Sequence, residues 1–267
     1  MKQLLKLYRM SLWEYVSTMK RYYANLIFWI VYAVVNAILM LLFIPLYSSA
    51  LSEIGTNNIL SFILIGATVL SISQNALYNA SDTMDFMLWG GIINYIFVTP
   101  VSRYEYFAAN SLAGATISFI IVSPIFVSAI AANIVHIGFL SLILGLLSMG
   151  VVLFSMLQFG LIFAMALLIF KRIEGLTGII TIIITFLSGS FIPLQVLPRS
   201  IDYIAMFIPS TSGLYLTRYY LAGSSLIFPV YLLWTILTIE TIVFFVTTYL
   251  LFKIAERKAE KIGLGYI

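Results

Sequence analysis

Charged residues are scarce in this sequence. Asp, Glu, Lys and Arg make up 9% of its 267 residues, whereas they make up roughly a quarter of an ordinary soluble domain. Hydrophobic residues account for 62%. This composition excludes an ordinary soluble enzyme and favours a protein that crosses a membrane several times.

Cysteine is absent, and the sequence has a single histidine, His136. The lack of Cys excludes disulfide bonds, thiolate metal sites and a Cys nucleophile. His136 lies near a short polar break, which favours an interfacial residue over a metal ligand or a catalytic base. No Gly is followed by Lys, so the phosphate-binding loop Gly-x-x-x-x-Gly-Lys is absent. We therefore expect no catalytic site, metal or cofactor in this chain.

The few charges are separated by apolar stretches of membrane-spanning length. A helix needs roughly 20 apolar residues to cross about 30 Å of hydrocarbon. The uncharged stretch between Glu105 and Lys171 is too long for one helix, so we place a turn at 132–136. The sequence thus predicts an all-α, polytopic membrane protein with a single transmembrane domain, 1–267. Its six predicted spans lie near 25–48, 57–80, 107–131, 137–170, 175–191 and 229–252.

The basic residues are distributed unevenly between the two sides of this topology. Of the 14 Lys and Arg residues, only Arg199 and Arg218 fall on the side opposite to the rest. Cytoplasmic segments carry the excess of Lys and Arg in membrane proteins. We therefore expect a plasma-membrane protein with both termini, including the tail at 253–267, in the cytoplasm. The net charge of +4 has the same origin, and nucleic acid is not expected as a partner.

Residues 1–24 carry apolar side chains at helical spacing ahead of the first span. One face holds Leu5, Tyr8, Leu12, Val16, Met19 and Tyr23, and another holds Lys2, Lys6 and Arg9. This pattern predicts a helix that lies flat in the membrane interface. Two roles are open for it: a simple membrane anchor and a contact for a partner protein.

A short apolar segment follows the second predicted span, within residues 82–105. Its middle, 88–98, is too short to cross the membrane. We expect Pro100 to end a short helix and Ser102 to cap the next one. Its aromatic content favours an interfacial helix presented to a partner over a simple connecting loop. The aromatic residues concerned are Trp89, Tyr95 and Phe97.

Prolines divide the segment 192–228, between the fifth and sixth predicted spans. They are Pro193, Pro198 and Pro209, and we expect short helices near 199–207 and 212–222. Non-helical backbone at membrane depth is tolerated only where protein or water satisfies it. The segment therefore suggests a gate or pore rim on the outer side.

Together these two segments resemble the ABC-2 type permease family, the membrane subunits of ATP-driven exporters of drugs, lipids and polysaccharides. The motifs that carry the resemblance are Thr-Pro-Val-Ser-Arg at 99–103, Ser-Gly at 188–189, Phe-x-Pro-Leu at 191–194, Leu-Pro at 197–198, Pro-Ser-Thr at 209–211, and Arg218 followed by Leu-x-Gly at 221–223. The resemblance covers essentially the whole chain. Daunorubicin exporters are the branch that it resembles most, followed by polysaccharide exporters.

The resemblance implies a permease that provides the substrate path, while a separate ABC ATPase subunit binds ATP and Mg. It further implies two permease copies, as a homodimer or a heterodimer, with two ATPases in a lipid bilayer. The residues implied in coupling to the ATPase are Trp89, Gly91, Tyr95, Pro100 and Arg103. Those implied in the outer gate are Pro193, Pro198, Pro209 and Arg218. The implied substrate is a hydrophobic drug, a lipid or a lipid-linked glycan.

Two alternatives to this function are kept. One is a polysaccharide- or glycolipid-exporting permease of the same family. The other is a secondary transporter, which would show matching interrupted helices in the two halves of the chain. We find only one proline-broken region, after the fifth span, which disfavours the secondary transporter.

The chain departs from the family pattern just before the coupling helix. Family members carry a charged run and a Gly-Thr there, with an acidic residue a few positions on. This chain has Met-Leu-Trp-Gly-Gly-Ile at 87–92 and Asn94 in place of the acid. We therefore expect the ATPase contact to be more apolar or differently placed.

Glu240 is the only acidic residue in the middle of a predicted span. Ionisable groups inside a membrane are costly and are functional candidates by default. Two roles are open for Glu240: a structural pairing with Arg218 and a place in the substrate path. The amide side chains of the spans are expected to form hydrogen bonds between helices. They belong to Asn36, Gln74, Asn75, Asn79, Asn110 and Gln158.

Overall fold

The computed structural model describes residues 2–42, 45, 59–131, 138–170, 174–190 and 193–262, and in these residues it contains helices and no strands. The predicted all-α fold class is confirmed for this part of the chain. The elements are α1 (Lys2–Arg21), α2 (Tyr23–Leu41), α5 (Ile59–Trp89), α6 (Ile92–Val98), α7 (Arg103–Ala131), α8 (Phe139–Phe170), α9 (Glu174–Leu187), the 3-10 helix η2 (Leu194–Val196), α10 (Arg199–Ala205), α11 (Pro209–Ala222) and α12 (Val230–Ile262).

Four helices in the described residues are long and apolar enough to cross a membrane, namely α5, α7, α8 and α12. They correspond to the second, third, fourth and sixth predicted spans. The apolar part of α9, Thr177–Leu187, is shorter; at a rise of about 1.5 Å per residue it does not reach across about 30 Å of hydrocarbon. α2 forms the described part of the first predicted span. A total of six spans therefore stays a prediction.

Several predicted features lie outside the described residues. They are the end of the first span, the start of the second, the turn at 132–136 with His136, residue 137, Lys171 and Arg172, residues 191–192, and the end of the tail at 263–267. The side chains of Asn36, Asn94 and Phe97 also lie outside the described part.

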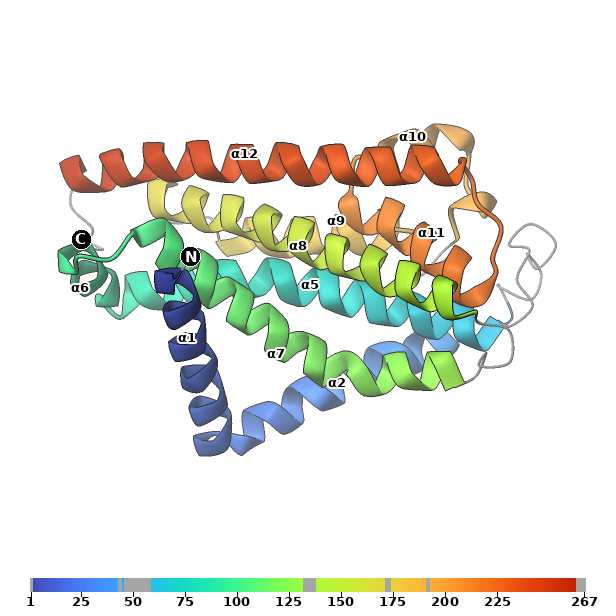
Figure 1. Ribbon diagram of the computed structural model, residues 1–267, viewed down its shortest axis with the longest axis horizontal. Coiled ribbons are helices and arrows are strands. Elements are labelled where there is room, and N and C mark those ends of the chain that lie inside the picture. Colours follow the sequence, from blue (N-terminus) through green and yellow to red (C-terminus); the bar gives the residue numbers. More distant parts are fainter. Residues whose placement is uncertain are drawn as a thin grey trace.

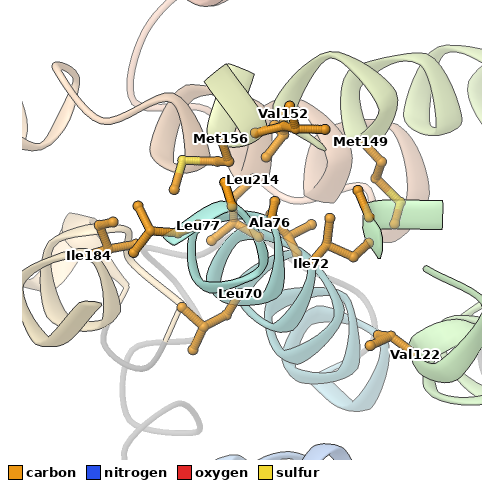
Figure 2. Close-up of a cluster of buried hydrophobic side chains, with 14 of the residues drawn as sticks. Leu70, Ile72, Ala76, Leu77, Val122, Met149, Val152, Met156, Ile184 and Leu214 are labelled. Carbon is orange, nitrogen blue, oxygen red and sulfur yellow. The ribbon is translucent and has the colours of Figure 1, made fainter. Parts of the chain in front are cut away.

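α5 is the central helix of the bundle (Figure 1). It packs against α7, α8 and α11 and is buried along most of its length. Figure 2 shows its apolar side chains among those of the surrounding helices. The labelled residues of this core are Leu70, Ile72, Ala76 and Leu77 of α5, Val122 of α7, Met149, Val152 and Met156 of α8, Ile184 of α9 and Leu214 of α11.

Glycines allow these helices to approach closely. A Cβ atom on Gly160 of α8 would lie 2.8 Å from the carbonyl oxygen of Leu77 on α5, and one on Gly213 of α11 would lie 1.8 Å from Val152 Cγ2. Lipid tails are as apolar as the helix surfaces, so helices in a bilayer associate through close van der Waals contact rather than through the hydrophobic effect. Small residues at these crossings provide that contact.

α1 runs across the long axis of the bundle (Figure 1) and packs on α7, an arrangement consistent with an interfacial helix. The docked face overlaps the predicted apolar face only in part: Tyr8 forms a hydrogen bond with Thr116 of α7 at 3.0 Å, whereas Leu5, Val16 and Tyr23 are exposed. Tyr15 Oη also donates hydrogen bonds to the amide oxygens of Asn79 and Asn110, at 2.9 and 3.1 Å. Apolar side chains pack as well against lipid as against another helix, whereas a hydroxyl group needs a polar partner.

Several helix boundaries differ from those predicted, and three of them lie at the coupling segment and at the end of the chain. α5 continues to Trp89, beyond the predicted end at 80, and α6 begins at Ile92 rather than at 88. Gly91 separates the two helices with a φ of 66°, a left-handed conformation that glycine adopts readily. α12 continues to Ile262, beyond the predicted end at 252, because neither Gly nor Pro interrupts the sequence before Gly263. Most of the predicted tail is thus an extension of the last helix.

Candidate coupling surface and outer gate

The candidate residues gather at opposite ends of the bundle (Figure 1). We call residues 86–105, which include α6, the coupling end, and residues 188–228, which include α10 and α11, the gate end. Trp89, Gly91, Tyr95, Pro100 and Arg103 belong to the coupling end. The gate end contains Pro193, Pro198, Pro209 and Arg218.

The coupling end presents an exposed aromatic surface. Trp89, at the end of α5, is 62% exposed, and Tyr95 of α6 is 77% exposed. Phe86 and Val98 beside them are also exposed. The opposite face of α6 anchors the helix, since Ile93 and Ile96 are buried. An exposed apolar patch of this kind is typical of a surface that meets a protein partner or the membrane.

Pro100 and Arg103 lie in the connection that leads from α6 into α7. Thr99 Oγ1 donates to the carbonyl oxygen of Ile96 at 2.7 Å and so closes α6. The Ser102 hydroxyl accepts a hydrogen bond from the backbone N–H of Glu105 at 3.4 Å, which confirms the predicted cap of α7.

Arg103 forms an ion pair with Glu256 of α12. A hollow of about 410 Å³ lies beside this ion pair, between the start of α7 and the end of α12. It is lined by residues 99–104 on one side and by Tyr249, Phe252, Lys253 and Glu256 on the other. The structure therefore divides the predicted coupling residues into two groups. One forms the exposed aromatic surface, and the other contacts α12.

The prolines of the gate end begin short helices. Pro193 precedes η2, Pro198 precedes α10, and Pro209 is the first residue of α11. The first helical position needs no backbone N–H donor, so Pro209 starts the helix rather than preceding it. This explains why α11 begins three residues before the predicted position, 212. α10 ends at Ala205, two residues before the predicted end at 207.

Arg218 is completely buried and ties α11 to the turn after α9 and to α5. Its guanidinium donates from Nη1 to the carbonyl of Gly189 at 2.8 Å and from Nη2 to that of Ser190 at 3.2 Å. Nε donates to the carbonyl of Phe62 on α5 at 3.2 Å, and the Phe62 ring lies 3.7 Å from the guanidinium carbon. Gly66 leaves the space for this group, because a Cβ atom there would lie 2.3 Å from Nη2.

A second buried group folds the gate segment onto α11. The Tyr215 hydroxyl accepts a hydrogen bond from the backbone N–H of Leu194 and donates one to Gln195 Oε1, both at 2.9 Å. Gly189, with a φ of 75°, makes the turn that precedes this segment. Arg218 and Tyr215 lie on the same helix, so the chain that follows α9 is held at two points.

Glu240 does not pair with Arg218, and that sequence interpretation is wrong. Its carboxylate accepts a hydrogen bond from Ser212 Oγ of α11 at 3.3 Å, whereas the Arg218 guanidinium donates to backbone carbonyls. The other carboxylate oxygen of Glu240 is buried and has no hydrogen-bond partner among the described residues. A structural pairing, now with Ser212, and a place in the substrate path both stay open for Glu240.

The intramembrane amides behave largely as predicted. Gln74 donates to Thr185 of α9 at 2.8 Å, and Asn79 and Asn110 accept from Tyr15 of α1. These three amides thus join different helices. Asn75 donates to Ser71 within its own helix, and the amide oxygen of Gln158 has no hydrogen-bond partner among the described residues.

Sequence reasoning missed Tyr15 and Glu256. Tyr15 lies outside the predicted apolar face of α1, and a tyrosine just off such a face is a signal for a polar contact across the interface. Glu256 lies in the charged end of the chain, where its sequence neighbours give no sign of a partner 153 residues away. No group of His, Asp and Glu in the described residues is placed to hold a metal ion.

The chain was compared with known families and proteins. Residues 12–222 match the family model described as ABC-2 type transporter. The match begins within α1 and ends at the last residue of α11, so it includes both the coupling end and the gate end. No curated protein matches the chain.

Proposed function

Because the chain belongs to the ABC-2 type transporter family and is the non-catalytic membrane permease of such a transporter, we propose that it forms the substrate path of an ATP-driven exporter. A permease of this family works with an ABC ATPase, which binds ATP and Mg. The observation that carries the proposal is the placement of an exposed aromatic surface and a buried polar gate at opposite ends of the same bundle.

In this proposal the ATPase docks on the aromatic surface of the coupling end. Trp89 and Tyr95 provide apolar contacts, and Gly91 allows the sharp turn that directs α6 toward the partner. Pro100 and Arg103 connect that contact to α7. The apolar character of the surface agrees with the absence of the family's charged run before the coupling helix.

The gate end controls exit of the substrate. Pro193, Pro198 and Pro209 start the short helices of this segment, and Arg218 holds them to α5. Glu240 accepts a hydrogen bond from Ser212 of α11, and its other carboxylate oxygen has no hydrogen-bond partner among the described residues. We assign it a place along the substrate path.

The assembly contains two permease copies, identical or different, and two ATPases. Each permease has six spans and both termini on the cytoplasmic side of the plasma membrane, as the distribution of Lys and Arg favours. The substrate is a hydrophobic drug, a lipid or a lipid-linked glycan. This choice is supported by the apolar and aromatic surface that α12 leaves exposed, including Tyr231, Ile239, Ile242 and Val246.

The test is reconstitution of the chain with its ATPase in proteoliposomes. ATP hydrolysis is measured while a hydrophobic drug, a phospholipid or a lipid-linked glycan is added, and movement of the same compound is followed with ATP or with a non-hydrolysable analogue. We expect one class to stimulate hydrolysis and to move only with ATP. ATP-independent movement by the chain alone would support a secondary transporter instead.

A further inference from the structure

α12 contacts both candidate ends of the molecule. It runs along the whole bundle in Figure 1 and contains 33 residues without an internal Gly or Pro. Glu256 lies near its last turns and Glu240 in its first half. At a rise of about 1.5 Å per residue, these two positions lie roughly 24 Å apart along one continuous helix.

At the coupling end, side chains of α12 contact the first turn of α7. Arg103 and Glu256 form an ion pair whose side chains are 21% and 31% exposed. The Tyr104 ring packs edge-on against Tyr249 and Phe252, with centroids 5.9 and 5.5 Å apart. Arg103 is the last residue of the motif at 99–103, which directly follows α6, so a displacement of α6 reaches this contact first.

At the gate end, α12 contacts α11, the helix that carries Arg218. The Ser212 hydroxyl of α11 donates to Glu240 at 3.3 Å, and Trp234 Nε1 of α12 donates to the Tyr220 hydroxyl at 3.1 Å. Leu237 lies beside Gly213 of α11. Movement of α12 therefore acts directly on α11.

Between its two ends α12 packs along α8 and otherwise faces outward. Phe244 and Phe245 stack on Phe159 and Phe154, and Thr248 Oγ1 donates to the Gln158 carbonyl at 3.0 Å. A helix held along one side by such contacts is able to slide by small steps as a rigid body, which is the shear mode of domain motion.

We propose that α12 is a rigid link between the coupling segment and the gate, and that Glu256 is the positioning residue through which Arg103 engages it. This inference rests on the proposed function. Displacement of the coupling segment is carried through the Arg103–Glu256 pair and the Tyr104 contacts into α12, and from Glu240 and Trp234 into α11. The ion pair is partly open to water. Its two charges can therefore separate and pair again without the full desolvation cost of a buried charge.

The experiment measures gate movement in the complete complex. The chain has no Cys, so Ser210→Cys introduces one reporter at a fully buried position of α11. Its labelling rate by a membrane-impermeant maleimide is compared without nucleotide and with ATP, Mg and vanadate. In the parent chain we expect ATP to change this rate.

Three variants and two matched controls in the Ser210→Cys background test the link. Glu256→Gln and Arg103→Gln should reduce the ATP-dependent change in labelling rate by about threefold, the size expected for a half-exposed ion pair. The charge-swapped double variant, Arg103→Glu with Glu256→Arg, should restore it. Glu14→Gln and Arg257→Gln, both at exposed positions, are matched controls and should behave as the parent. ATP hydrolysis in the same samples verifies that the ATPase is bound.

Two results would overturn the inference. If the single variants keep the full ATP-dependent change, or if the swap fails to restore it, α12 is not engaged through this pair. If the parent itself shows no ATP-dependent change while the ATPase is bound and active, the proposed function fails together with the inference. Rescue by the swap assigns the effect to the ion pair, and retained ATP hydrolysis in the single variants shows that they still fold and bind the ATPase.

Discussion

The coupling end and the gate end differ in where their polar and apolar groups lie. The coupling end exposes aromatic side chains, and its ion pair is partly open to solvent. The gate end holds a network of fully buried polar groups, namely Arg218, Ser188, Ser190 and Thr211, although Tyr203 and Phe207 are exposed there as well. A surface of the first kind is suited to binding another protein. A network of the second kind fixes the position of its own segments.

This difference indicates that the two ends of the bundle have different roles. Substitutions at the coupling end should leave the fold intact and disturb contact with the ATPase. Substitutions at the gate end should disturb the fold first, because unsatisfied polar groups in a water-poor interior are costly. The substitutions below test this contrast in order of decreasing expected effect.

Arg218→Ala should give the largest effect. It leaves the carbonyls of Phe62, Gly189 and Ser190 without this donor, at a cost of about 1–3 kcal/mol for each buried group that stays unsatisfied. We expect loss of most of the folded protein, measured by size-exclusion chromatography in detergent and by thermal unfolding. Gly66→Ala should act in the same direction, because its Cβ would collide with the guanidinium. Normal yield and stability of both variants would show that the gate is not held by Arg218.

Tyr95→Glu should leave stability nearly unchanged and weaken the complex. Exposed substitutions usually change the free energy of unfolding by less than about 0.5 kcal/mol, whereas loss of an aromatic anchor costs about 2 kcal/mol at an interface, or more than about tenfold in affinity. Affinity for the ATPase is measured by titration in nanodiscs. The control is Tyr231→Glu, because Tyr231 is an exposed tyrosine on a different helix, α12. Equal affinities of the two variants would remove α6 from the ATPase contact.

Tyr15→Phe should have an intermediate effect on the docking of α1. The hydroxyl donates to Asn79 and Asn110, and its removal should cost about 1 kcal/mol. Burial raises the pKa of Tyr15, so the donor stays protonated at neutral pH. Hydrogen exchange of the α1 amides should speed up in Tyr15→Phe but not in Tyr22→Phe, where the tyrosine is exposed. Unchanged protection of α1 would show that these hydrogen bonds do not hold it.

Asp202→Asn should give the smallest effect, a gain in stability at the gate end. Burial raises the pKa of Asp202, while the charge of Arg199 opposes that shift. A raised pKa means that folding favours the neutral carboxyl; this contribution is complete below the ordinary Asp pKa and is lost as pH rises through the folded value. Asp202→Asn should therefore raise the unfolding temperature at pH 7 and change it little at acidic pH. A gain of equal size at both pH values would exclude ionisation of Asp202 as the cause.

The sequence predicted the helices better than their contacts. Long charge-free stretches identify α5, α7, α8 and α12, because the hydrocarbon thickness sets a minimum length. Turn chemistry located the start of α7 at Ser102 and the two short helices that follow Pro198 and Pro209, but not the 3-10 helix after Pro193. These features depend on residues close together in the chain, which is why they are readable from it.

The contacts of the charged residues could not be predicted from the sequence in the same way. A pairing of Arg218 with Glu240 was one of the two roles left open for Glu240, yet Arg218 binds backbone carbonyls of α5 and of the turn after α9. Every residue has a backbone carbonyl, so the sequence does not show which carbonyl oxygens accept these hydrogen bonds. The positions of the carbonyls of Gly189 and Ser190 depend on how the turn at Gly189 folds. The partner of Arg103 was missed for a related reason, since Glu256 is one of several acidic residues near charged neighbours. Only tertiary packing selects it.

The most direct test of the account is which end of the permease touches the ATPase. Single cysteines at Tyr95 on the coupling end and at Tyr203 on the gate end, both exposed in the structure, are joined to a photoactivated cross-linker in the purified complex. The account predicts a cross-linked product with the ATPase from the Tyr95 position and none from the Tyr203 position. Cross-linking from the Tyr203 position with none from the Tyr95 position would contradict it.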